Sequence, residues 1–285
     1  MMKWQCKLVW EGDSMTIKKA LTIAGSDTSG GAGIQADLKT FQERDVYGMT
    51  ALTVIVAMDP RNNWAHQVFP VALETIEAQL TCALEGVGVD AVKTGMLPTV
   101  PIIELAARKI AEHKLQRVVI DPVMVCKGTD EPLHPENATA MRELLLPLAL
   151  VTTPNLFEAA QLAGCGPIRS VDEMKEAAVA IHRAGARHVL IKGGRKLGLE
   201  KAIDLLYDGE SFELLEGDLL DTTYTHGAGC TTAAAITAEL AKGADAKTAV
   251  RTAKAFVTAA IRHGFPLNQY VGPTLHAAYR HHGVK

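Results

Sequence analysis

The sequence predicts an α/β fold in which helices cover both faces of a mainly parallel central sheet. Short apolar runs alternate with longer amphipathic stretches along most of the chain, as in successive βα repeats. The apolar runs are nearly continuous, as expected of strands buried on both faces. Small or polar clusters follow the runs, at the sheet edge where open parallel sheets bind ligands. A three-layer arrangement, doubly wound or related to it, is therefore expected, with a site at that edge.

The strands are expected where apolar residues are most concentrated, at 20–24, 51–58, 91–94, 118–120, 150–153 and 189–191. Amphipathic periodicity predicts helices at 32–43, 72–85, 101–113, 135–145, 157–164 and 171–184. The last of these has acidic residues from Asp172 to Glu176 at its start and Gly185 at its end, which favour a helix there. The pattern then changes to a hairpin, 203–207 and 211–215, around Asp208-Gly209. Two further helices are expected at 232–241 and 249–262, before Gly243 and Gly264.

Composition excludes several classes of protein. Apolar residues make up 48% of the 285 and charged residues 21%, which is ordinary for a soluble globular domain. The net charge of −3 argues against the basic surface that nucleic-acid binding requires. No apolar run approaches the ~20 residues that span a membrane. The five cysteines are far apart and contain no CxxC pair, which argues against a disulfide framework or a structural zinc site. We expect a cytoplasmic enzyme without nucleic-acid or membrane partners.

The first fourteen residues differ from the rest of the chain. They contain Lys3 and Lys7 but neither a long apolar core nor a cleavage site, so a signal peptide is not expected. We interpret 1–14 as a leader, non-native or disordered, with Met15 as the true start. Residues 15–285 are expected to form one domain, because no linker, low-complexity segment or internal repeat interrupts them.

The stretch 225–232 (THGAGCTT) is the strongest candidate for a functional turn. Gly227 and Gly229 permit a tight turn, and an alanine-rich helix follows it. Converging backbone N–H groups and the positive end of a helix favour an anion such as phosphate. Cys230 lies at this turn, where we expect a lowered pKa for its thiol. The alternative is a glycine-rich loop that only closes a βα unit.

The first glycine-rich segment, 29–33 (SGGAG), does not have the spacing of a dinucleotide-binding loop. No acidic residue clearly ends the second strand to hold a ribose, and GxxxxGK[ST] occurs nowhere in the sequence. A nicotinamide-dependent oxidoreductase and a P-loop enzyme are therefore disfavoured.

Six segments in fixed order carry a family resemblance. They are 20–27 (ALTIAGSD), 29–40 (SGGAGIQADLKT), 121–124 (DPVM), 153–159 (TPNLFEA), 192–194 (KGG) and 226–231 (HGAGCT). Together they resemble the hydroxymethylpyrimidine kinase and pyridoxal kinase group over essentially 18–273. The resemblance implies a ribokinase-like three-layer α/β/α sandwich that uses ATP and Mg²⁺. It also implies a homodimer, whose interface the sequence does not reveal.

The resemblance assigns catalytic roles to the 225–232 stretch. Gly227, Ala228, Gly229 and Cys230 would form an anion hole whose N–H groups bind the transferred phosphoryl group. Cys230 would be the base that accepts the proton of the substrate hydroxyl. A buried structural cysteine is the alternative for Cys230. A non-catalytic binding protein on this fold would be expected to lack Cys230 or Glu158, and the sequence has both.

The resemblance also implies where metal, ATP and acceptor bind. Asp121 and Glu158 would hold Mg²⁺, with Asn155 one helical turn from Glu158. ATP would contact Asn155, Lys192, Gly193, Gly194, Gly227 and Lys254, although a lysine such as Lys254 on a helix is often only solvated. The acceptor would contact Gly25, Asp37, Met58, Met96 and Cys126.

Two of these residues bear on the identity of the acceptor. Met58 stands where hydroxymethylpyrimidine kinases resemble one another in having glutamine, and methionine has no amide to pair with an aminopyrimidine. Core packing is the alternative for Met58. Cys126 lies before 128–133, which we interpret as a mobile lid, and its thiol could add to the aldehyde of pyridoxal with Lys127 favouring the thiolate. A surface cysteine without a role is the alternative.

These inferences favour ATP-dependent phosphorylation of the 5′-hydroxymethyl group of pyridoxal, pyridoxine or pyridoxamine, as in vitamin B6 salvage. The expected partners are that vitamin-type small molecule and ATP. The rival is a hydroxymethylpyrimidine (phosphate) kinase of thiamine biosynthesis, or an enzyme with both activities. Catalysis would rest mainly on positioning and electrostatics.

Overall fold

The computed structural model describes residues 16–124 and 135–282. Their strands form one nine-stranded sheet in the order β3-β2-β1-β4-β5-β6-β7-β8-β9. The six strands from β2 to β7 in this order are parallel, and β3, β8 and β9 add antiparallel to the two ends. The strands are β1 (Lys19–Asp27), β2 (Tyr47–Asp59), β3 (Ala65–Pro70), β4 (Ala91–Thr94), β5 (Val118–Ile120), β6 (Val151–Thr152), β7 (His188–Gly194), β8 (Ala202–Tyr207) and β9 (Phe212–Gly217).

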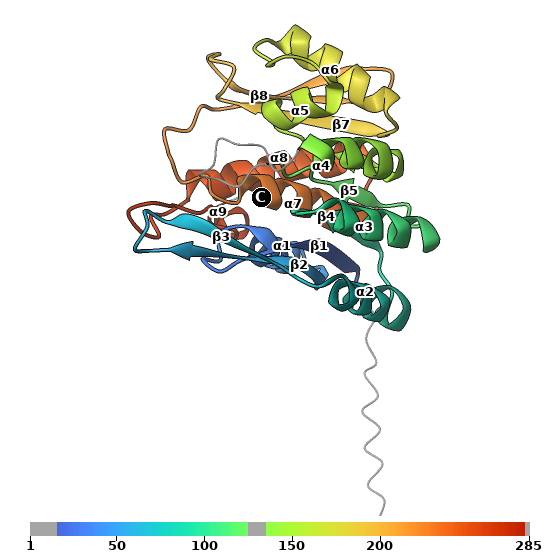
Figure 1. The fold of residues 1–285 in the computed structure, drawn as a ribbon. Helices are drawn as coiled ribbons and strands as arrows, with labels where there is room; N and C mark the ends of the chain where they lie inside the picture. The colour runs from blue at the N-terminus through green and yellow to red at the C-terminus, as the bar shows by residue number, and fades with distance from the viewer. Residues whose placement is uncertain (1–15, 125–134, 283–285) are drawn as a thin grey trace, which may run out of the picture.

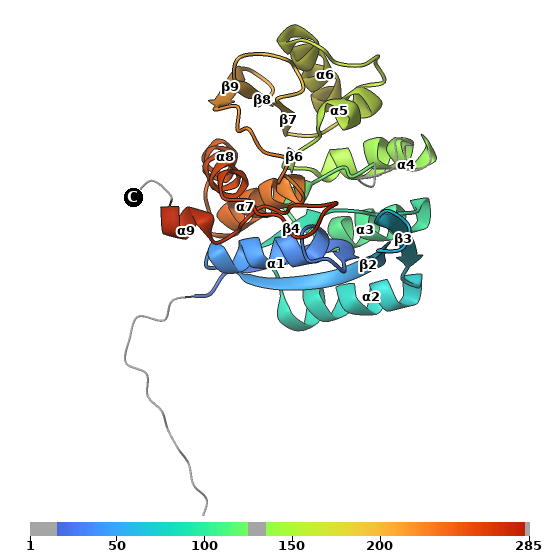
Figure 2. The ribbon, with the colours of Figure 1, turned by 90° about the vertical axis from the view of Figure 1, so that its left-hand side faces the viewer.

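Helices cover both faces of this sheet (Figures 1 and 2). One layer contains α1 (Gly33–Glu43), α7 (Ala228–Ala241) and α8 (Ala246–Arg262), with the short α9 (Ala278–His282) packed on α8. The other layer contains α2 (Leu73–Thr81), α3 (Val100–Glu112), α4 (Pro135–Ala140), α5 (Leu156–Ala163) and α6 (Val171–Arg183). Short π-helical and 3-10 turns continue two of these helices, at Cys82–Val87, Met141–Leu145 and Leu146–Leu148.

Each face of the sheet has its own apolar core, because side chains alternate along every strand. Leu21, Val118 and Ile120 join the core beneath α2–α6, whereas Val119 and Leu190 join the core beneath α7 and α8. This two-sided burial explains why the strand segments are nearly continuous apolar runs. The predicted α/β/α sandwich with a mainly parallel sheet is confirmed.

The connection order reverses beside β1, which pairs with β2 on one side and with β4 on the other. Helices following the two strands therefore diverge, and the loops after their carboxyl ends leave a crevice. The loops after β1 and β4 and the start of α7 meet at this edge.

The antiparallel strand β3 is absent from the predicted elements. Its sequence AHQVFP contains a histidine, a glutamine and a proline, and most of its residues are exposed. A proline is tolerated there because β3 is an edge strand. Helix α7 also begins at Ala228, four residues before its predicted start, so Cys230 lies in the first helical turn.

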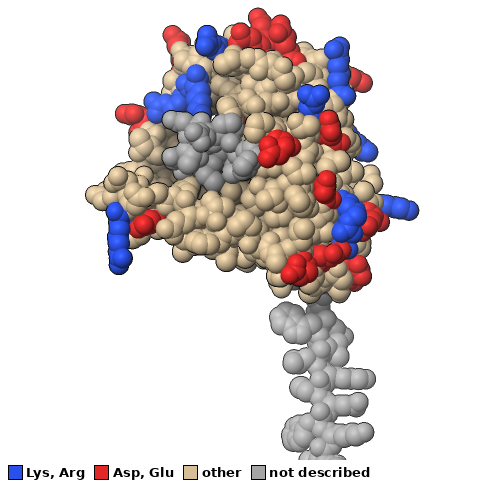
Figure 3. Space-filling view, in the orientation of Figure 1, with Lys and Arg blue, Asp and Glu red and all other residues tan. Residues whose placement is uncertain are grey.

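Acidic and basic side chains are interspersed over the face shown in Figure 3, where no field of one sign is seen among the described residues. Among those residues no helix combines the length and the hydrophobicity that crossing a bilayer requires.

Candidate active site

A cavity of about 660 Å³ opens at the carboxyl ends of β1, β4, β5 and β7. One end is walled by β2 and β3, and the other by β8, α8 and the 217–222 segment. The first turn of α7 lies in the wall of the same cavity. The cavity therefore extends from the β2–β3 hairpin past the start of α7 to the side of β8 and α8.

The start of α7 has the geometry of an anion site. Gly227 has φ +80°, and a Cβ there would lie 1.9 Å from the Gly31 carbonyl oxygen, so no other residue fits without a shift. The amides of Gly229 and Cys230 follow in the first turn, where N–H groups have no partner within the helix. The Lys192 ammonium lies nearby, 3.4 Å from the position that a Cβ on Gly229 would take. Helix dipole, amides and ammonium together favour a negatively charged ligand.

One amide of the predicted anion hole already has a partner within the chain. The Ala228 N–H donates to the Thr225 carbonyl at 3.1 Å, and this bond closes the turn that precedes α7. The amides on either side of Ala228 are therefore better placed to bind a ligand than the Ala228 amide itself.

The pKa of Cys230 differs from the prediction. Burial raises the pKa of this thiol to about 11, although the Lys93 ammonium and a hydrogen bond with the Gly33 backbone act in the opposite direction. The expectation of a lowered pKa was wrong because it considered the helix terminus and not the desolvation of the sulfur. Cys230 is thus held mainly as a thiol, and its thiolate is a strong base.

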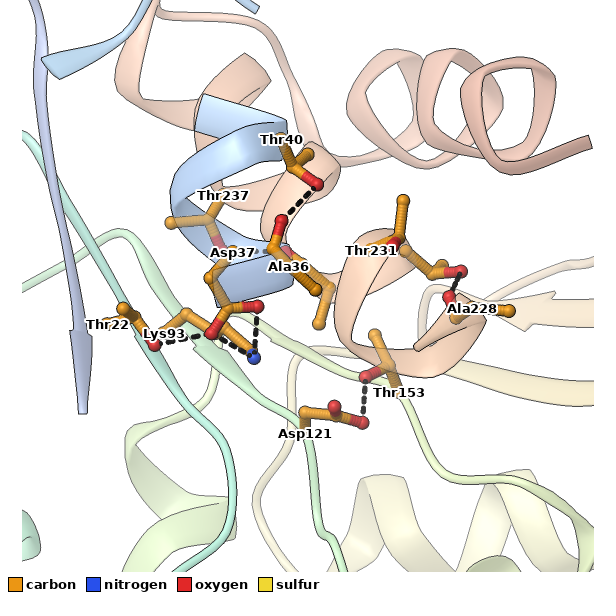
Figure 4. A network of polar contacts seen from close by, with 12 residues as sticks. Thr22, Ala36, Asp37, Thr40, Lys93, Asp121, Thr153, Ala228, Thr231 and Thr237 are labelled. Carbon is orange, nitrogen blue, oxygen red and sulfur yellow. Dashed lines mark hydrogen bonds and ion pairs between the residues drawn. The ribbon is translucent and has the colours of Figure 1, made fainter. Parts of the chain in front are cut away.

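Asp37 lies behind the cavity and not in its lining. Its side chain is fully buried, 2.8 Å from the Lys93 ammonium through both carboxylate oxygens, and it accepts a hydrogen bond from Thr22 at 2.7 Å (Figure 4). Burial raises the pKa of Asp37, with Lys93 opposing this shift. Lys93, in contrast, reaches the cavity lining. The structure therefore corrects the prediction of substrate contact by Asp37, whose contacts fix the position of Lys93.

Asp121, Glu158 and Lys192 form a charged group on one wall of the cavity. The Lys192 ammonium lies 3.3 Å from Asp121 Oδ1, which also accepts a hydrogen bond from Thr153 at 3.1 Å. Burial raises the pKa of Glu158 to about 7, while Lys192 opposes the shift and Asp121 adds to it. Among the described residues no three His, Cys, Asp or Glu side chains converge as a complete ligand set.

Asn155 and Glu158 form a capping box at the start of α5. Asn155 accepts a hydrogen bond from the Glu158 amide at 3.0 Å, and Glu158 accepts one from the Asn155 amide at 2.8 Å. This reciprocal cap fixes the Glu158 carboxylate at the cavity wall. The predicted i, i+3 pair thus has a structural role in addition to its place in the cavity lining.

A buried His226–Asp27 pair joins the α7 turn to the loop after β1. His226 Nε2 lies 2.8 Å from Asp27 Oδ2, and Asp27 also accepts hydrogen bonds from the Ser29 and Ala32 amides, each at 2.8 Å. Burial alone would raise the pKa of Asp27, yet hydrogen bonds from His226 and Ser29 lower it to about 2. Any Cβ on Gly31 would lie 2.3 Å from the His226 ring, so glycine is required beneath it.

The end of the cavity at β2 and β3 is lined by apolar and weakly polar groups. Met58 and His66 are direct partners in the β2–β3 pairing, and both face the cavity. Gly25 and Met96 line the same cavity, and a Cβ on Gly25 would meet Val54 at 2.6 Å. This end suits a flat apolar ring that carries a few polar substituents.

The other end of the cavity contains more charge. Gly193 and Gly194 bring the backbone of β7 to the wall, and a Cβ on Gly193 would lie 2.4 Å from a β8 carbonyl oxygen. Lys254 is 2.6 Å from Asp204 and packs beside Gly217. It is therefore a paired residue of the cavity wall rather than a solvated surface lysine.

The lining contains every predicted site residue that the structure describes except Asp37. Cys126 and the proposed lid at 128–133 lie outside the described residues, as do 1–14. Sequence reasoning did not single out Lys93, Asp27 or His66, and it left the role of His226 open. Lys93 could have been found, because it is a charged residue within a strand predicted to be buried. The pairing of His226 with Asp27 joins residues 199 positions apart, and no local pattern predicts that.

Comparison with known proteins identifies related sequences and structures. Residues 27–275 match the family described as phosphomethylpyrimidine kinase. The pyridoxine kinase of Bacillus subtilis (strain 168) is 67% identical over 266 residues, which cover 93% of this chain and 98% of the relative. A hydroxymethylpyrimidine/phosphomethylpyrimidine kinase of the same organism is 44% identical over 270 residues, which cover 95% of this chain and 98% of the relative.

Solved structures agree with these sequence matches. The ADP complex of Bacillus subtilis pyridoxal kinase superposes with a TM-score of 0.91 at 67% identity, covering 93% of this chain and 99% of that one. The pyridoxal kinase of Staphylococcus aureus in complex with AMP-PCP and pyridoxal has a TM-score of 0.88 at 53% identity, covering 93% and 95% of the two chains.

Proposed function

This chain belongs to the phosphomethylpyrimidine kinase family, and from that membership and its site we propose that it is an ATP-dependent pyridoxal/pyridoxine kinase. The reaction transfers the γ-phosphoryl group of ATP to the 5′-hydroxymethyl oxygen of a B6 vitamer. The observation that carries this proposal is the position of Cys230 and the open α7 amides between the two ends of one cavity.

The choice of acceptor is supported by two independent observations. The pyridoxine kinase relative is 67% identical, whereas the pyrimidine kinase relative is 44% identical. Met58, which lines the acceptor end, has no group that can pair with an aminopyrimidine edge. Hydroxymethylpyrimidine remains the second candidate acceptor because the family includes kinases for it.

The residues of this chain divide the work of transfer between proton removal, charge stabilisation and binding. The thiolate form of Cys230, a minor fraction because burial raises the pKa of this thiol, accepts the proton of the acceptor hydroxyl at Sγ as the hydroxyl oxygen bonds to phosphorus and the bond to the ADP oxygen breaks. The amides of Gly227, Gly229 and Cys230 and the Lys192 ammonium stabilise charge on the moving phosphoryl group. The β2–β3 wall with Met58 orients the acceptor ring. The nucleotide is bound by Asn155, Gly193, Gly194 and Lys254.

Asp121 and Glu158 are suited to hold Mg²⁺ together with phosphate oxygens and water. Both are carboxylates on one wall of the cavity, and Mg²⁺ prefers one or two such ligands plus substrate phosphates. When bound, the ion neutralises charge on the β- and γ-phosphates. Lys192, paired with Asp121, contributes a second positive charge to the same region.

The experiment that tests this function compares kcat/KM for pyridoxal, pyridoxine and hydroxymethylpyrimidine with one preparation and saturating MgATP. We expect both B6 vitamers to exceed the pyrimidine by at least ~10-fold, since a site without polar partners for the aminopyrimidine leaves its polar atoms unpaired. A preference for hydroxymethylpyrimidine would contradict the assignment.

Cys126 has a proposed role that depends on the aldehyde of pyridoxal. Its thiolate would add to the aldehyde carbon to give a hemithioacetal, with the proton passing to the former carbonyl oxygen. The Cys126→Ala variant should therefore lose activity with pyridoxal and retain it with pyridoxine, which has no aldehyde. Equal losses with both substrates, or no loss with either, would refute this capture.

We also propose that the enzyme is a cytoplasmic homodimer. On the face of the β2–β3 hairpin turned away from the cavity, the paired residues Ile55 and Phe69 are 41% and 52% exposed, and Leu73 at the start of α2 is 42% exposed. Such an apolar face is typical of a surface that another subunit covers. Sedimentation of wild type and Phe69→Glu tests it, with dissociation to monomers expected for the variant.

A further inference from the structure

The β2–β3 hairpin forms the acceptor wall, and its end is weakly held beyond Val56, where the pairing of β2 with β1 stops. Val56, Met58 and His66 line the cavity, while β2 is the only described strand with which β3 pairs, and most β3 residues are exposed. The end of such an edge hairpin opens at low free energy unless another segment holds it. Its distance from the start of α7 therefore depends on contacts beyond the sheet.

The segment between α8 and α9 runs close to the tip of this hairpin (Figure 1). It is bonded on both sides of its Pro273 to His226, because His226 N–H donates to the Gly272 carbonyl at 3.1 Å and Thr274 N–H donates to the His226 carbonyl at 3.2 Å. Gly272 packs against the Tyr224 ring, where a Cβ would lie 2.1 Å from a ring carbon. The segment is thus fixed to the residue that precedes the anion turn.

One aromatic pair joins the hairpin tip to this segment. The rings of Trp64 and Tyr270 stack with centroids 5.8 Å apart and planes inclined by 18°. Separations and angles of this order are typical of attractive offset stacking. The contact connects two segments that are far apart in the sequence, of which one carries the acceptor wall and the other is bonded beside the anion turn.

Each ring is fixed by a local turn. Trp64 has φ +64°, a conformation that disfavours bulky side chains, and its N–H donates to the Asp59 carbonyl at 3.0 Å. On the other side, the Asn268 side chain accepts hydrogen bonds from the Tyr270 and Val271 amides at 2.8 and 3.0 Å. The position of each ring is therefore set by its own turn, and the stacking contact joins two locally ordered ends.

We propose that Trp64 and Tyr270 form an aromatic clasp that holds the acceptor wall against the His226 segment, and that Trp64 is a positioning residue for the acceptor. The proposal rests on the proposed function. With the clasp closed, Met58 and His66 keep a fixed separation from the α7 turn. With the clasp open, the wall moves away and the acceptor binds less tightly, while the nucleotide end of the cavity is unchanged.

Steady-state kinetics of Trp64→Ala, Tyr270→Ala and the double variant test this clasp. Each single variant should raise the KM for pyridoxine about 2- to 10-fold, the range that loss of one aromatic pair implies, with the KM for ATP nearly unchanged. The double variant should be no worse than the poorer single variant, because both remove the same contact. Trp64→Phe should restore most of the affinity.

A matched control is available at the opposite edge of the sheet. Phe212 stacks on Tyr207 with ring centroids 4.5 Å apart at the β8–β9 hairpin and does not line the cavity. Phe212→Ala should leave both KM values unchanged. Additive effects of Trp64→Ala and Tyr270→Ala, equal rises in both KM values, or no change in either would overturn the proposal.

A second measurement does not depend on the substrate. The chain has three tryptophans, so Trp4→Phe with Trp10→Phe leaves Trp64 as the only one in the full-length protein. Acrylamide quenching of Trp64 should increase about 2-fold when Tyr270→Ala removes the stacked ring, and it should remain unchanged with Phe212→Ala. If the enzyme phosphorylated no B6 vitamer, the proposed function would be wrong, and the clasp would be decided by this quenching alone.

Discussion

Lys93 illustrates at the scale of one residue how a buried charge is accommodated. Its side chain is fully buried, yet both oxygens of Asp37 lie at 2.8 Å, so a strong local partner offsets the loss of water. Although burial itself lowers the pKa of Lys93, Asp37 raises it well above its usual range. The pair connects β4 to α1, and Thr22 extends the connection to β1.

Lys93→Met should lower the free energy of unfolding by about 3–5 kcal/mol, because Asp37 would be left buried without its partner. Urea unfolding monitored by circular dichroism measures this change. Lys18→Met is the matched control, since Lys18 pairs with Asp90 at 3.3 Å on the surface. This substitution should lower the free energy of unfolding by at most about 1 kcal/mol. Similar losses for the two variants would contradict this account.

Cys230→Ala should lower kcat about 10²- to 10⁴-fold, the usual contribution of a positioned base, with little change in ATP binding. Single-turnover rates and nucleotide titration separate the two effects. Cys165→Ala, at an exposed free cysteine, should have wild-type kinetics. Full turnover by Cys230→Ala would exclude a role for the sulfur.

Glu158→Gln should raise the Mg²⁺ concentration required for half-maximal rate by at least ~10-fold while preserving the cap of α5, since glutamine still accepts a hydrogen bond. The matched control is Glu173→Gln in the capping box of α6, which has the same local geometry on the surface. That variant should leave the Mg²⁺ dependence unchanged. An equal effect of both substitutions would indicate a purely structural role for Glu158.

Helix α7 shows at the scale of an element how backbone geometry creates the anion site. Its N-cap Gly227 is left-handed and lies against the Gly31 carbonyl, so the helix starts directly over the loop that follows β1. A residue with a side chain cannot occupy both the conformation and the space.

Gly227→Ala should lower both stability and kcat, because the added methyl would displace the start of α7. Gly243→Ala is the control, because Gly243 at the other end of α7 has φ +98° but no atom of another described residue within 4 Å of a Cβ. Gly243→Ala should lower the free energy of unfolding by about 1 kcal/mol, because of the backbone conformation alone, and leave kcat unchanged. Thermal unfolding and initial rates measure both quantities.

Most elements could be predicted from sequence because their burial is two-sided and periodic. Strands such as β1 and β5 are continuous apolar runs, and α6 has a complete capping box. The edge strand β3 could not be predicted, because its exposed residues satisfy no burial pattern. The early start of α7 was missed because Gly227 and Gly229 suggest a turn, although the helix already contains the second of them.

At the scale of the whole molecule, the site could be predicted only where its residues belong to recognisable motifs. The 226–231 and 192–194 segments lie together at the cavity, as the parallel-sheet edge requires. His66 reaches the same cavity because β3 pairs with β2, and Lys93 is held there by its buried ion pair with Asp37. Such long-range partners depend on the complete fold, and the local sequence contains no signal for them.

The stability of the whole molecule should depend on pH through His276. Burial lowers the pKa of His276 to about 4 from 6.5, with Lys39 adding to the effect. Between these values the unfolded chain binds a proton that the folded chain does not, so stability falls as the pH decreases from 6.5 to 4, by up to about 3 kcal/mol.

Urea unfolding at several pH values tests this dependence, with His276→Gln as the variant that lacks the titrating group. Its stability should vary less over this range than that of wild type. His281→Gln, at an exposed histidine, should retain the wild-type slope. An unchanged slope in His276→Gln would assign the effect to other groups.

The two antiparallel hairpins at opposite margins of the sheet make the cavity modular. In the proposed arrangement the acceptor would contact β2–β3 and the nucleotide would contact the β8–β9 side, with the α7 turn common to both. Exchange of the residues at one margin could therefore redirect the enzyme to a new vitamin while its phosphate donor and its chemistry are inherited intact. A change of substrate within such kinases would then require substitutions in one edge hairpin and not at the α7 turn.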